Sequence, residues 1–488
     1  MNFINSITIP EQVTEVIKSY IQDFENSDRR EEMDYGEDYY RSHNTEIMSR
    51  KMLIYAEDDN GVPYEIEDPY KANNKLPAGY FKLLVDQKVD YLLGKEVAFE
   101  SEQADDLTEL LGRRFQIILM RAGKEASKKV VSWIHPYIDA DGKFQLMVIP
   151  SEQVIPIYDM YDREKLNIII RYYAVKVLNE DNESVNVNRV EVWDDEQVTY
   201  YQENTETGLY DLLGESDMSN IFGRTYPNPK YHFSKDMRHG DKVTQTEGLA
   251  WGAVPFISLY NNDEEESDLN PVKAHIDAYD IVTSDFVNNL EDFQDVYWIL
   301  KGYQGQNLQE FLTQVKRYKT LKVGEDGDAR AETIQIPHEA RKEARAALEK
   351  DIFNYGMGVN PNLTGDGNVT NVVLKSRFAN LDLKASQFEL ELKDCIYTLI
   401  DFVNRYQELN SGTIIELDDV TFNRSMIMNE VELLEANASQ QGKVSEDTRL
   451  SEHPWVSDIE AEKEAMDKEG EVNLDDFEGD DDEPEEES

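Results

Sequence analysis

One stretch of 41 residues, from Val369 to Leu409, contains neither glycine nor proline. Apolar residues recur in it at intervals of three and four, from Leu374 to Tyr406. That period is typical of one face of an α-helix. At 1.5 Å per residue the helix would be about 60 Å long, roughly twice the diameter of a small domain. The chain must therefore build an extended helical part.

Two further helices are predicted before this stretch. One covers 271–297, and the second covers 337–358, from a proline at its start to glycines at its end. Between them, 298–336 has the pattern of a compact α/β insert. Two helices that flank a compact insert lie antiparallel, so this region predicts a rod that carries a knob.

The N-terminal half combines helices with short strands. Helical spacing and boundary residues predict helices over 10–25, 28–43, 77–93 and 105–126. From Val130 onward, β-branched and aromatic segments alternate with turns. They cover 130–138, 144–149, 154–158, 166–177, 189–193 and 197–202. We predict an antiparallel meander of about six strands, then a long surface loop over 203–250 and one more strand over 254–260.

The strongest loop signal is the glycine- and proline-containing segment from Asn360 to Asn368. It separates two predicted helices. After the long helix, we predict a strand over 413–422 and a helix over 429–439. The final eighteen residues hold eleven carboxylates and no base. A tail of this composition repels itself and buries little, so 456–488 should be a disordered, solubilising segment.

The net charge is strongly negative but unevenly distributed. The 488 residues include 100 Asp and Glu against 49 Lys and Arg, a net charge of −51. Residues 1–297 account for −29 and residues 410–488 for −21, whereas 298–409 holds 16 acidic and 15 basic side chains. Phosphate binding favours Lys and Arg. The total charge therefore argues against a nucleic-acid-binding protein, and the interior block is the exception.

No motif for catalysis, a cofactor or a metal is present. The chain lacks a P-loop, a Gly-x-Ser-x-Gly elbow and a His-Glu-x-x-His pair. Asp139-Ala140-Asp141-Gly142 fits a hairpin turn better than a calcium loop, whose twelfth position would need Glu instead of Val148. The single Cys395 excludes an internal disulfide. We expect no catalytic residue, no cofactor, no metal, no signal peptide and no membrane span.

Several short segments of the sequence resemble those of a known protein family. Asn74-Lys75-Leu76-Pro77 precedes Tyr80–Val89 and Tyr91–Lys95. Weaker segments follow in order: Val254–Phe256, Asn261-Asn262, Asp277–Asp280, Asp285-Phe286, Asp292-Phe293, Gly442–Thr448 and His453-Pro454. Together they span most of 70–460 and resemble the portal proteins (head-tail connectors) of tailed bacteriophages. The match is closest to the siphophage type from viruses of Gram-positive bacteria.

The resemblance implies an α+β, portal-like fold that is mainly helical, with long stem and crown helices. It also implies a mixed α/β wing containing the antiparallel β meander, and a small α/β clip. The parts fall at 1–270 for the wing, 271–297 for stem helix one, 298–336 for the clip, 337–358 for stem helix two, 359–371 for the tunnel loop, 372–455 for the crown and 456–488 for the acidic tail.

The resemblance also implies a function and partners. The chain would be a structural protein that forms a dodecameric ring at a unique capsid vertex of the virion, assembled in the host cytoplasm. Double-stranded DNA would pass through the ring in genome packaging and ejection, without sequence specificity. The ring would dock the terminase large subunit and head-completion, adaptor or tail proteins, and would meet the major capsid and scaffolding proteins. No membrane partner is expected.

Candidate functional residues follow from the same resemblance. The channel loop would comprise Asn360, Pro361, Asn362, Leu363, Thr364, Gly365, Asp366, Gly367 and Asn368. It has one acid and no base, so it would touch DNA sterically. Arg341, Lys342 and Arg345 are candidates for contact with DNA; alternatively they pair with Glu339, Glu343 and Glu349 or face a neighbouring subunit. Lys316, Arg317, Lys319 and Lys322 on the clip could face DNA, the terminase or a neighbour.

Two other functions stay open at this point. A metal-dependent phosphodiesterase could use some of the clustered carboxylates, although no ligand spacing supports one. A structural adaptor could assemble without contacting DNA. The near-neutral segment 298–409 agrees with the hypothesis of a portal protein, because tight phosphate binding along a channel would hinder a sliding duplex.

Overall fold

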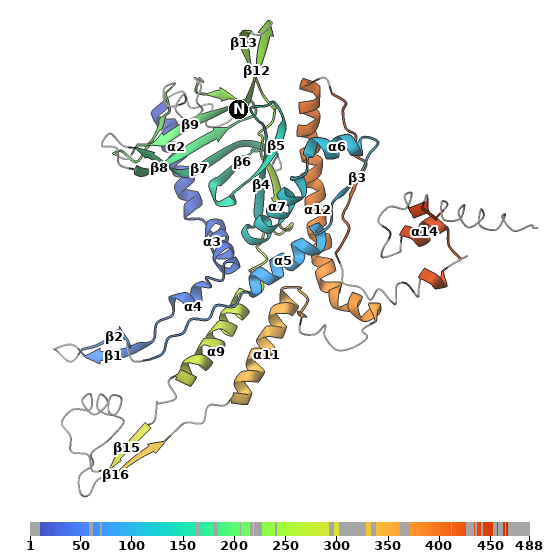
Figure 1. Cartoon of the computed structure of the whole chain (residues 1–488). Coiled ribbons are helices and arrows are strands. Elements are labelled where there is room, and N and C mark those ends of the chain that lie inside the picture. Colours follow the sequence, from blue (N-terminus) through green and yellow to red (C-terminus); the bar gives the residue numbers. More distant parts are fainter. Residues whose placement is uncertain are drawn as a thin grey trace, which may run out of the picture. The chain divides into compact units, whose positions relative to one another are not determined.

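The computed structural model describes residues 10–57, 62–68, 71–162, 165–178, 184–204, 206–214, 218, 227–239, 242–291, 297–301, 328–332, 338–361, 370–410, 412–425, 434, 437–440, 443–451, 456, 462–463 and 465–466. They have mixed α and β structure (Figure 1). The chain forms two compact units, Met1–Gly358 with Leu383–Ser425, and Val359–Asp382 with Met426–Ser488.

The N-terminal helices begin where local signals place them. α2 (Pro10–Glu25) starts at a proline, whose missing N–H costs nothing in a first helical turn. α3 (Asp28–Tyr40) begins after Ser27, whose hydroxyl accepts the backbone N–H of Arg30. A short α4 (Thr45–Ser49) follows, and then the hairpin of β1 (Leu53–Glu57) and β2 (Pro63–Glu67).

The predicted helix over 105–126 is wrong as a single element. It is two helices, α6 (Ala104–Leu111) and α7 (Phe115–Lys129). Gly112, with φ of +69°, ends α6 in a conformation that favours glycine. The helix predicted from residue 77 also starts later, because α5 covers Tyr80–Leu93.

The predicted meander is confirmed for its larger part. β6 (Val154–Tyr158), β7 (Leu166–Leu178), β8 (Ser184–Trp193), β9 (Gln197–Glu203) and β10 (Tyr210–Leu212) pair antiparallel in chain order. β11 (Lys230-Tyr231) adds to β9. The first two predicted strands do not belong to it. β4 (Val131–Ile138) and β5 (Phe144–Ile149) form a separate sheet with β14 (Ile257–Tyr260).

β4 is buried on both faces, which explains its nearly continuous apolar run. Trp133 packs with the core of the six-stranded sheet, beside Trp193 and Phe256. Ile134 points to the opposite side, into the main core. Successive side chains of a strand alternate between faces, so β4 joins the two sheets.

The prediction of a surface loop over 203–250 is wrong. That segment contains β10, β11 and a hairpin of β12 (Phe233–His239) and β13 (Lys242–Leu249). The polar sequence of β12 and β13 did not indicate strands. The two strands pair with each other through backbone hydrogen bonds, which do not depend on an apolar pattern.

The main core lies where α5 and α7 pack beside the three-stranded sheet. It includes Leu84, Leu92, Ile134 and, from the long helix α12 (Asn371–Leu409), Phe388 and Ile396, each at most 2 % exposed. β3 (Ala98–Glu100) pairs with β17 (Asp419–Thr421), the part of the strand predicted over 413–422 that forms. The helix predicted over 429–439 lies largely outside the described residues. α14 covers Glu446–Ser451.

The two predicted stem helices are present and lie side by side (Figure 1). α9 covers Lys273–Glu291, so it ends before Tyr297, which already belongs to a strand. α11 covers His338–Tyr355. Between them in sequence, β15 (Tyr297–Lys301) pairs antiparallel with β16 (Asp328–Glu332). Of the predicted α/β insert over 298–336, only these two strands are described, and the rest lies outside the described residues.

Candidate functional site

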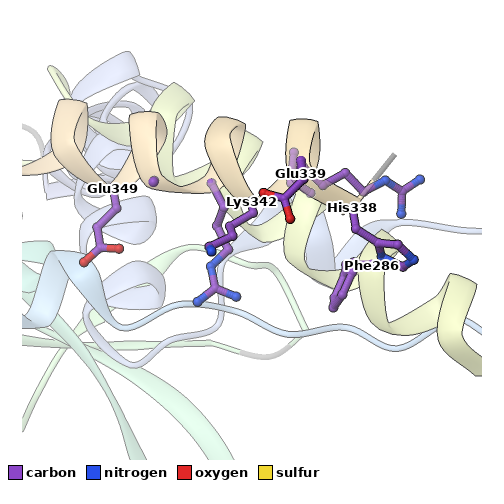
Figure 2. A pocket seen from close by; sticks show the side chains of 9 residues that line it. Phe286, His338, Glu339, Lys342 and Glu349 are labelled. Carbon is purple, nitrogen blue, oxygen red and sulfur yellow. The ribbon is translucent and has the colours of Figure 1, made fainter. Parts of the chain in front are cut away.

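α9 and α11 enclose an open groove of about 460 Å³ that contains the predicted basic residues. Val282 and Phe286 line it from α9. From α11 the lining residues are His338, Glu339, Arg341, Lys342, Arg345, Ala346 and Glu349. Figure 2 shows His338 above Phe286, with Lys342 and Glu349 farther along α11. We call these nine residues the stem groove, which sets apolar α9 side chains beside three cations and two carboxylates.

The structure brings Arg341, Lys342 and Arg345 together and turns two of them toward α9. Arg341 Nη1 lies 3.5 Å from the backbone oxygen of Asp285. The guanidinium of Arg345 lies 5.7 Å from the ring centroid of Tyr279, within cation–π range. Lys342 is exposed. Contact of these three residues with DNA stays a prediction.

An aromatic cluster lies where α9 and α11 meet the start of α5. The ring of Tyr80, at the start of α5, meets Tyr279 and Phe353 edge-on at 5.0 and 5.8 Å between centroids. Such edge-to-face pairs are favourable because a positive ring edge meets a negative face. Burial, followed by the hydrogen bond with Tyr279, raises the pKa of Tyr80 far above its ordinary value. α5, α9 and α11 therefore share one packed joint.

A regular set of hydrogen bonds fixes the segment before α5 along α9. The backbone N–H groups of Asn74, Leu76 and Ala78 donate to Asn288 Oδ1 (2.6 Å), Ser284 Oγ (3.1 Å) and Asp280 Oδ1 (2.8 Å). Four residues of helix rise about 6 Å, close to the length of two extended residues. We call these three bonds the stem ladder.

The stem ladder explains the motif and the late start of α5. Pro77 has no N–H, but it falls between two donors, at a position where none is needed. Ala78 gives its N–H to α9. A segment whose donors are used in this way stays extended, so the helix begins only at Tyr80.

The acceptors of the ladder are buried. Asp280 and Ser284 are fully buried, and Asn288 is 4 % exposed. Asn44, also fully buried, donates its amide to Asp280 Oδ2 at 2.5 Å. Burial raises the pKa of Asp280 to about 6, against the opposing effect of the hydrogen bonds from Asn44 and Ala78. A buried carboxyl with a raised pKa thus lies where the segment before α5 packs along α9.

A second buried set of polar residues, centred on the carboxylate of Asp268, joins α5 to α12. Lys88 Nζ lies 2.7 Å from Asp268 Oδ2, and Lys384 Nζ lies 3.1 Å from Asp268 Oδ1. Asn261 donates to Asp268 at 3.0 Å and accepts from Lys88. Burial lowers the pKa of Lys88 to about 8. Burial also opposes ionisation of Asp268, but Lys384 and Lys88 outweigh it and hold its pKa well below the usual value.

Other predicted site residues lie outside the described part of the chain. Of the channel loop, Asn360 and Pro361 are described, whereas 362–368 are not. The clip residues Lys316, Arg317, Lys319 and Lys322 are also outside it. Their roles stay predictions.

Among the described residues, no three His, Cys, Asp or Glu side chains are grouped so that they could hold a metal ion. No helix there has the length and apolar character needed to cross a bilayer.

Comparison with known proteins decides the family. The family described as phage portal protein, SPP1 Gp6-like, matches residues 20–474. The chain belongs to this family. The portal protein of Bacillus phage SPP1 is 28 % identical over 464 residues, covering 92 % of this chain and 86 % of that protein. The portal protein of Clostridium phage phiCD119 is 28 % identical over 454 residues, covering 89 % and 92 %.

Solved structures give a weaker likeness. The neck of a native GTA particle, computed with C12 symmetry, has 12 % identity and a TM-score of 0.35, covering 76 % of this chain and 89 % of that one. The neck of an empty GTA particle has 10 % identity and a TM-score of 0.38, with the same coverage.

Family membership fixes the class of function. This portal protein is a structural, non-enzymatic protein of the phage virion, located at the capsid vertex, where it takes part in head-tail connection and DNA packaging. The family implies an oligomeric ring in the neck. The alternative of a metal-dependent phosphodiesterase is therefore wrong.

The segments that resemble portal proteins include residues of both buried groups, but the sequence alone indicated no role for them. Lys88, Asn261 and Asp280 anchor the two buried groups. A sequence signal for the ladder did exist. Asp280, Ser284 and Asn288 are polar residues four apart on a helix with a separate apolar stripe.

Proposed function

We propose that this portal protein assembles as a ring of twelve subunits whose channel conducts double-stranded DNA in packaging and ejection. The family match over 20–474 carries the proposal, because it spans the predicted wing, stem, clip and crown. The DNA would be conducted without sequence specificity. Since 298–409 is close to neutral, the duplex could slide without being held by phosphate contacts.

The proposed parts follow the chain. The wing would be 1–270, the stem 271–297 with 337–358, the tunnel loop 359–371, the crown 372–455 and the acidic tail 456–488. The clip, 298–336, would dock the terminase large subunit and the head-completion, adaptor or tail proteins through Lys316, Arg317, Lys319 and Lys322. Major capsid and scaffolding proteins would meet the outer parts. The side-by-side α9 and α11, with paired β15 and β16 between them in sequence, support this stem and clip.

The stem cations have two candidate partners. Arg341, Lys342 and Arg345 could face DNA or a neighbouring subunit, and both partners are anionic. Their shared groove supports a common role for all three.

Electron microscopy of the purified protein tests the ring. We expect a wide ring with a central hole in negative stain, and a native mass of twelve subunits. A compact monomer at high concentration would refute the ring. A ring that assembles but never retains DNA would favour the structural adaptor.

Deletion of 362–368 tests the tunnel loop. We expect rings to form normally while packaging or DNA retention fails, because the loop would contact DNA sterically. Removal of Glu206 and Thr207 from the exposed turn between β9 and β10 is the matched control and should leave packaging intact. Normal packaging by the 362–368 deletion would refute the role of the loop.

A further inference from the structure

The β1–β2 hairpin exposes apolar side chains that a folded chain normally covers. All five residues of β2 are exposed. Tyr55 is 77 % exposed and Leu53 is 49 % exposed. The register pairs Leu53 with Glu67 and Tyr55 with Glu65, so these four side chains share one face. We call it the mixed face of the hairpin.

Such a hairpin needs a surface to pack on. A two-stranded sheet alone in water is marginally stable. The root of the hairpin is fixed, since Arg50 pairs with Asp285 of α9 at 2.8 Å and Asn73 donates to the carbonyl of Arg50. The arm beyond that root is the exposed part. Between residues 53 and 68 the sequence has six carboxylates and no base.

The stem groove has the complementary composition. It offers Val282 and Phe286 from α9 beside Arg341, Lys342 and Arg345 from α11. Its three cations outnumber its two carboxylates, Glu339 and Glu349, whereas the whole chain has a net charge of −51. The first ten residues of α11 are exposed except Arg341, which is half-buried. Within one copy, the α11 side of the groove is therefore mostly exposed, whereas Val282 and Phe286 on α9 are half-buried.

We infer that the β1–β2 hairpin of one copy occupies the stem groove of the next copy in the ring. Leu53 and Tyr55 would cover Val282 and Phe286, and Glu65 and Glu67 would meet the three cations. The contact joins two different surfaces, and a head-to-tail contact of this kind generates a ring when the rotation closes. The inference rests on the proposed ring and assigns the stem cations to a neighbour instead of DNA.

Cysteine cross-linking in the full chain tests the contact. In the double variant Glu65→Cys with Lys342→Cys, a short bismaleimide should join neighbouring subunits. Denaturing gels should then show a ladder that extends beyond the dimer. Native Cys395 will not interfere, because it is buried and its pKa is raised to about 12 by that burial. Each single variant should run as a monomer.

A second cysteine pair controls for cross-links that form by random collision of subunits. Tyr161 lies in the turn between β6 and β7 and is 94 % exposed. Tyr161→Cys with Lys342→Cys should give no ladder. Rings without a ladder in the Glu65 pair, or a link confined to the monomer, would overturn the inference and leave the ring standing. Absence of rings in the parent protein would overturn both.

Charge reversal gives an independent readout. Glu65→Lys with Glu67→Lys should weaken subunit association about tenfold at low ionic strength, and less at high salt. Adding Arg341→Glu and Lys342→Glu should restore it. The exposed turn changes Glu196→Lys and Glu206→Lys are the control and should have no effect. If the hairpin reversals leave rings intact while Lys342→Glu alone blocks packaging, the groove faces DNA and the inference fails.

Discussion

Replacing Asp280 by Asn should stabilise this portal protein at neutral pH. The buried Asp280 carboxylate is held by two neutral donors, Ala78 N–H and the Asn44 amide. In the Asp280→Asn variant, the side-chain oxygen that remains can still accept from Ala78. The new amide nitrogen can donate to Asn44 Oδ1, which is buried and has no hydrogen-bond partner among the described residues. This requires rotation of the Asn44 amide, which gives up the 3.2 Å hydrogen bond from Asn44 Nδ2 to the carbonyl of Ala78.

The magnitude follows from the pKa. Burial raises the pKa of Asp280 to about 6, from an ordinary value near 4. A shift of about two units corresponds to about 3 kcal/mol, and loss of the hydrogen bond from Asn44 to Ala78 reduces the gain to about 1–2 kcal/mol. Between pH 4 and 6 the folded protein binds more protons than the unfolded chain. The contribution of Asp280 to the free energy of unfolding therefore falls as pH rises through this window and is constant above it.

Urea unfolding at pH 4.5 and pH 7.5 measures the effect. We expect Asp280→Asn to gain about 1–2 kcal/mol over wild type at pH 7.5. At pH 4.5 only about a third of the ionisation penalty remains, and the lost bond from Asn44 to Ala78 offsets it, so we expect little net gain there. All other carboxylates cancel in the comparison. Asp277→Asn is the control on the same helix: it loses a 3.0 Å ion pair with Lys273 and should destabilise. A loss of stability in Asp280→Asn at pH 7.5, or a difference that does not change with pH, would refute the reasoning.

Three further changes test the joint by thermal or urea unfolding. Asp268→Asn should cost about 3–5 kcal/mol, because two lysines remain buried beside a neutral group. Ser284→Ala should cost about 1–2 kcal/mol, since the N–H of Leu76 loses its acceptor. Gly356→Ala should cost about 1–3 kcal/mol, because the new Cβ would lie 2.5 Å from Leu84 Cδ1 and 2.7 Å from the carbonyl of Ile352.

Each change has a matched control that should alter the free energy of unfolding little. Asp419→Asn removes an ion pair whose carboxylate side chain is 46 % exposed. Asn289→Ala lies one residue beyond the ladder and loses a bond within α9. Gly123→Ala meets its neighbours at no less than 3.4 Å. If the controls cost as much as the test variants, the buried joint has no special role.

The sequence predicted those helices whose limits are set locally. α2 has the predicted limits and α12 begins two residues after the predicted start, because a proline start or an unbroken apolar stripe marks them. The strands of the meander could also be predicted, because their sequence pattern is local. The division into two sheets could not be predicted, since β14 pairs with β4 from more than a hundred residues away.

The packing of the segment before α5 along α9 could not be predicted for the same reason. Pro77 looked like a first helical residue, but its neighbours give their N–H groups to a helix two hundred residues away. The polar spacing on α9 was visible in the sequence, whereas its partner was not. The stem cations were found as candidates, and only the structure placed them beside Phe286 in one groove.

The two kinds of contact respond differently to salt. The stem ladder consists of hydrogen bonds from backbone N–H groups to buried side chains, so ions in solution screen it weakly. The inferred contact between hairpin and groove joins exposed carboxylates to exposed cations, so rising ionic strength should weaken it. Subunits should therefore separate in salt with the stem ladder intact. If circular dichroism instead showed loss of helix together with loss of rings, one cooperative unit would span both contacts, and the ladder would not be independent of assembly.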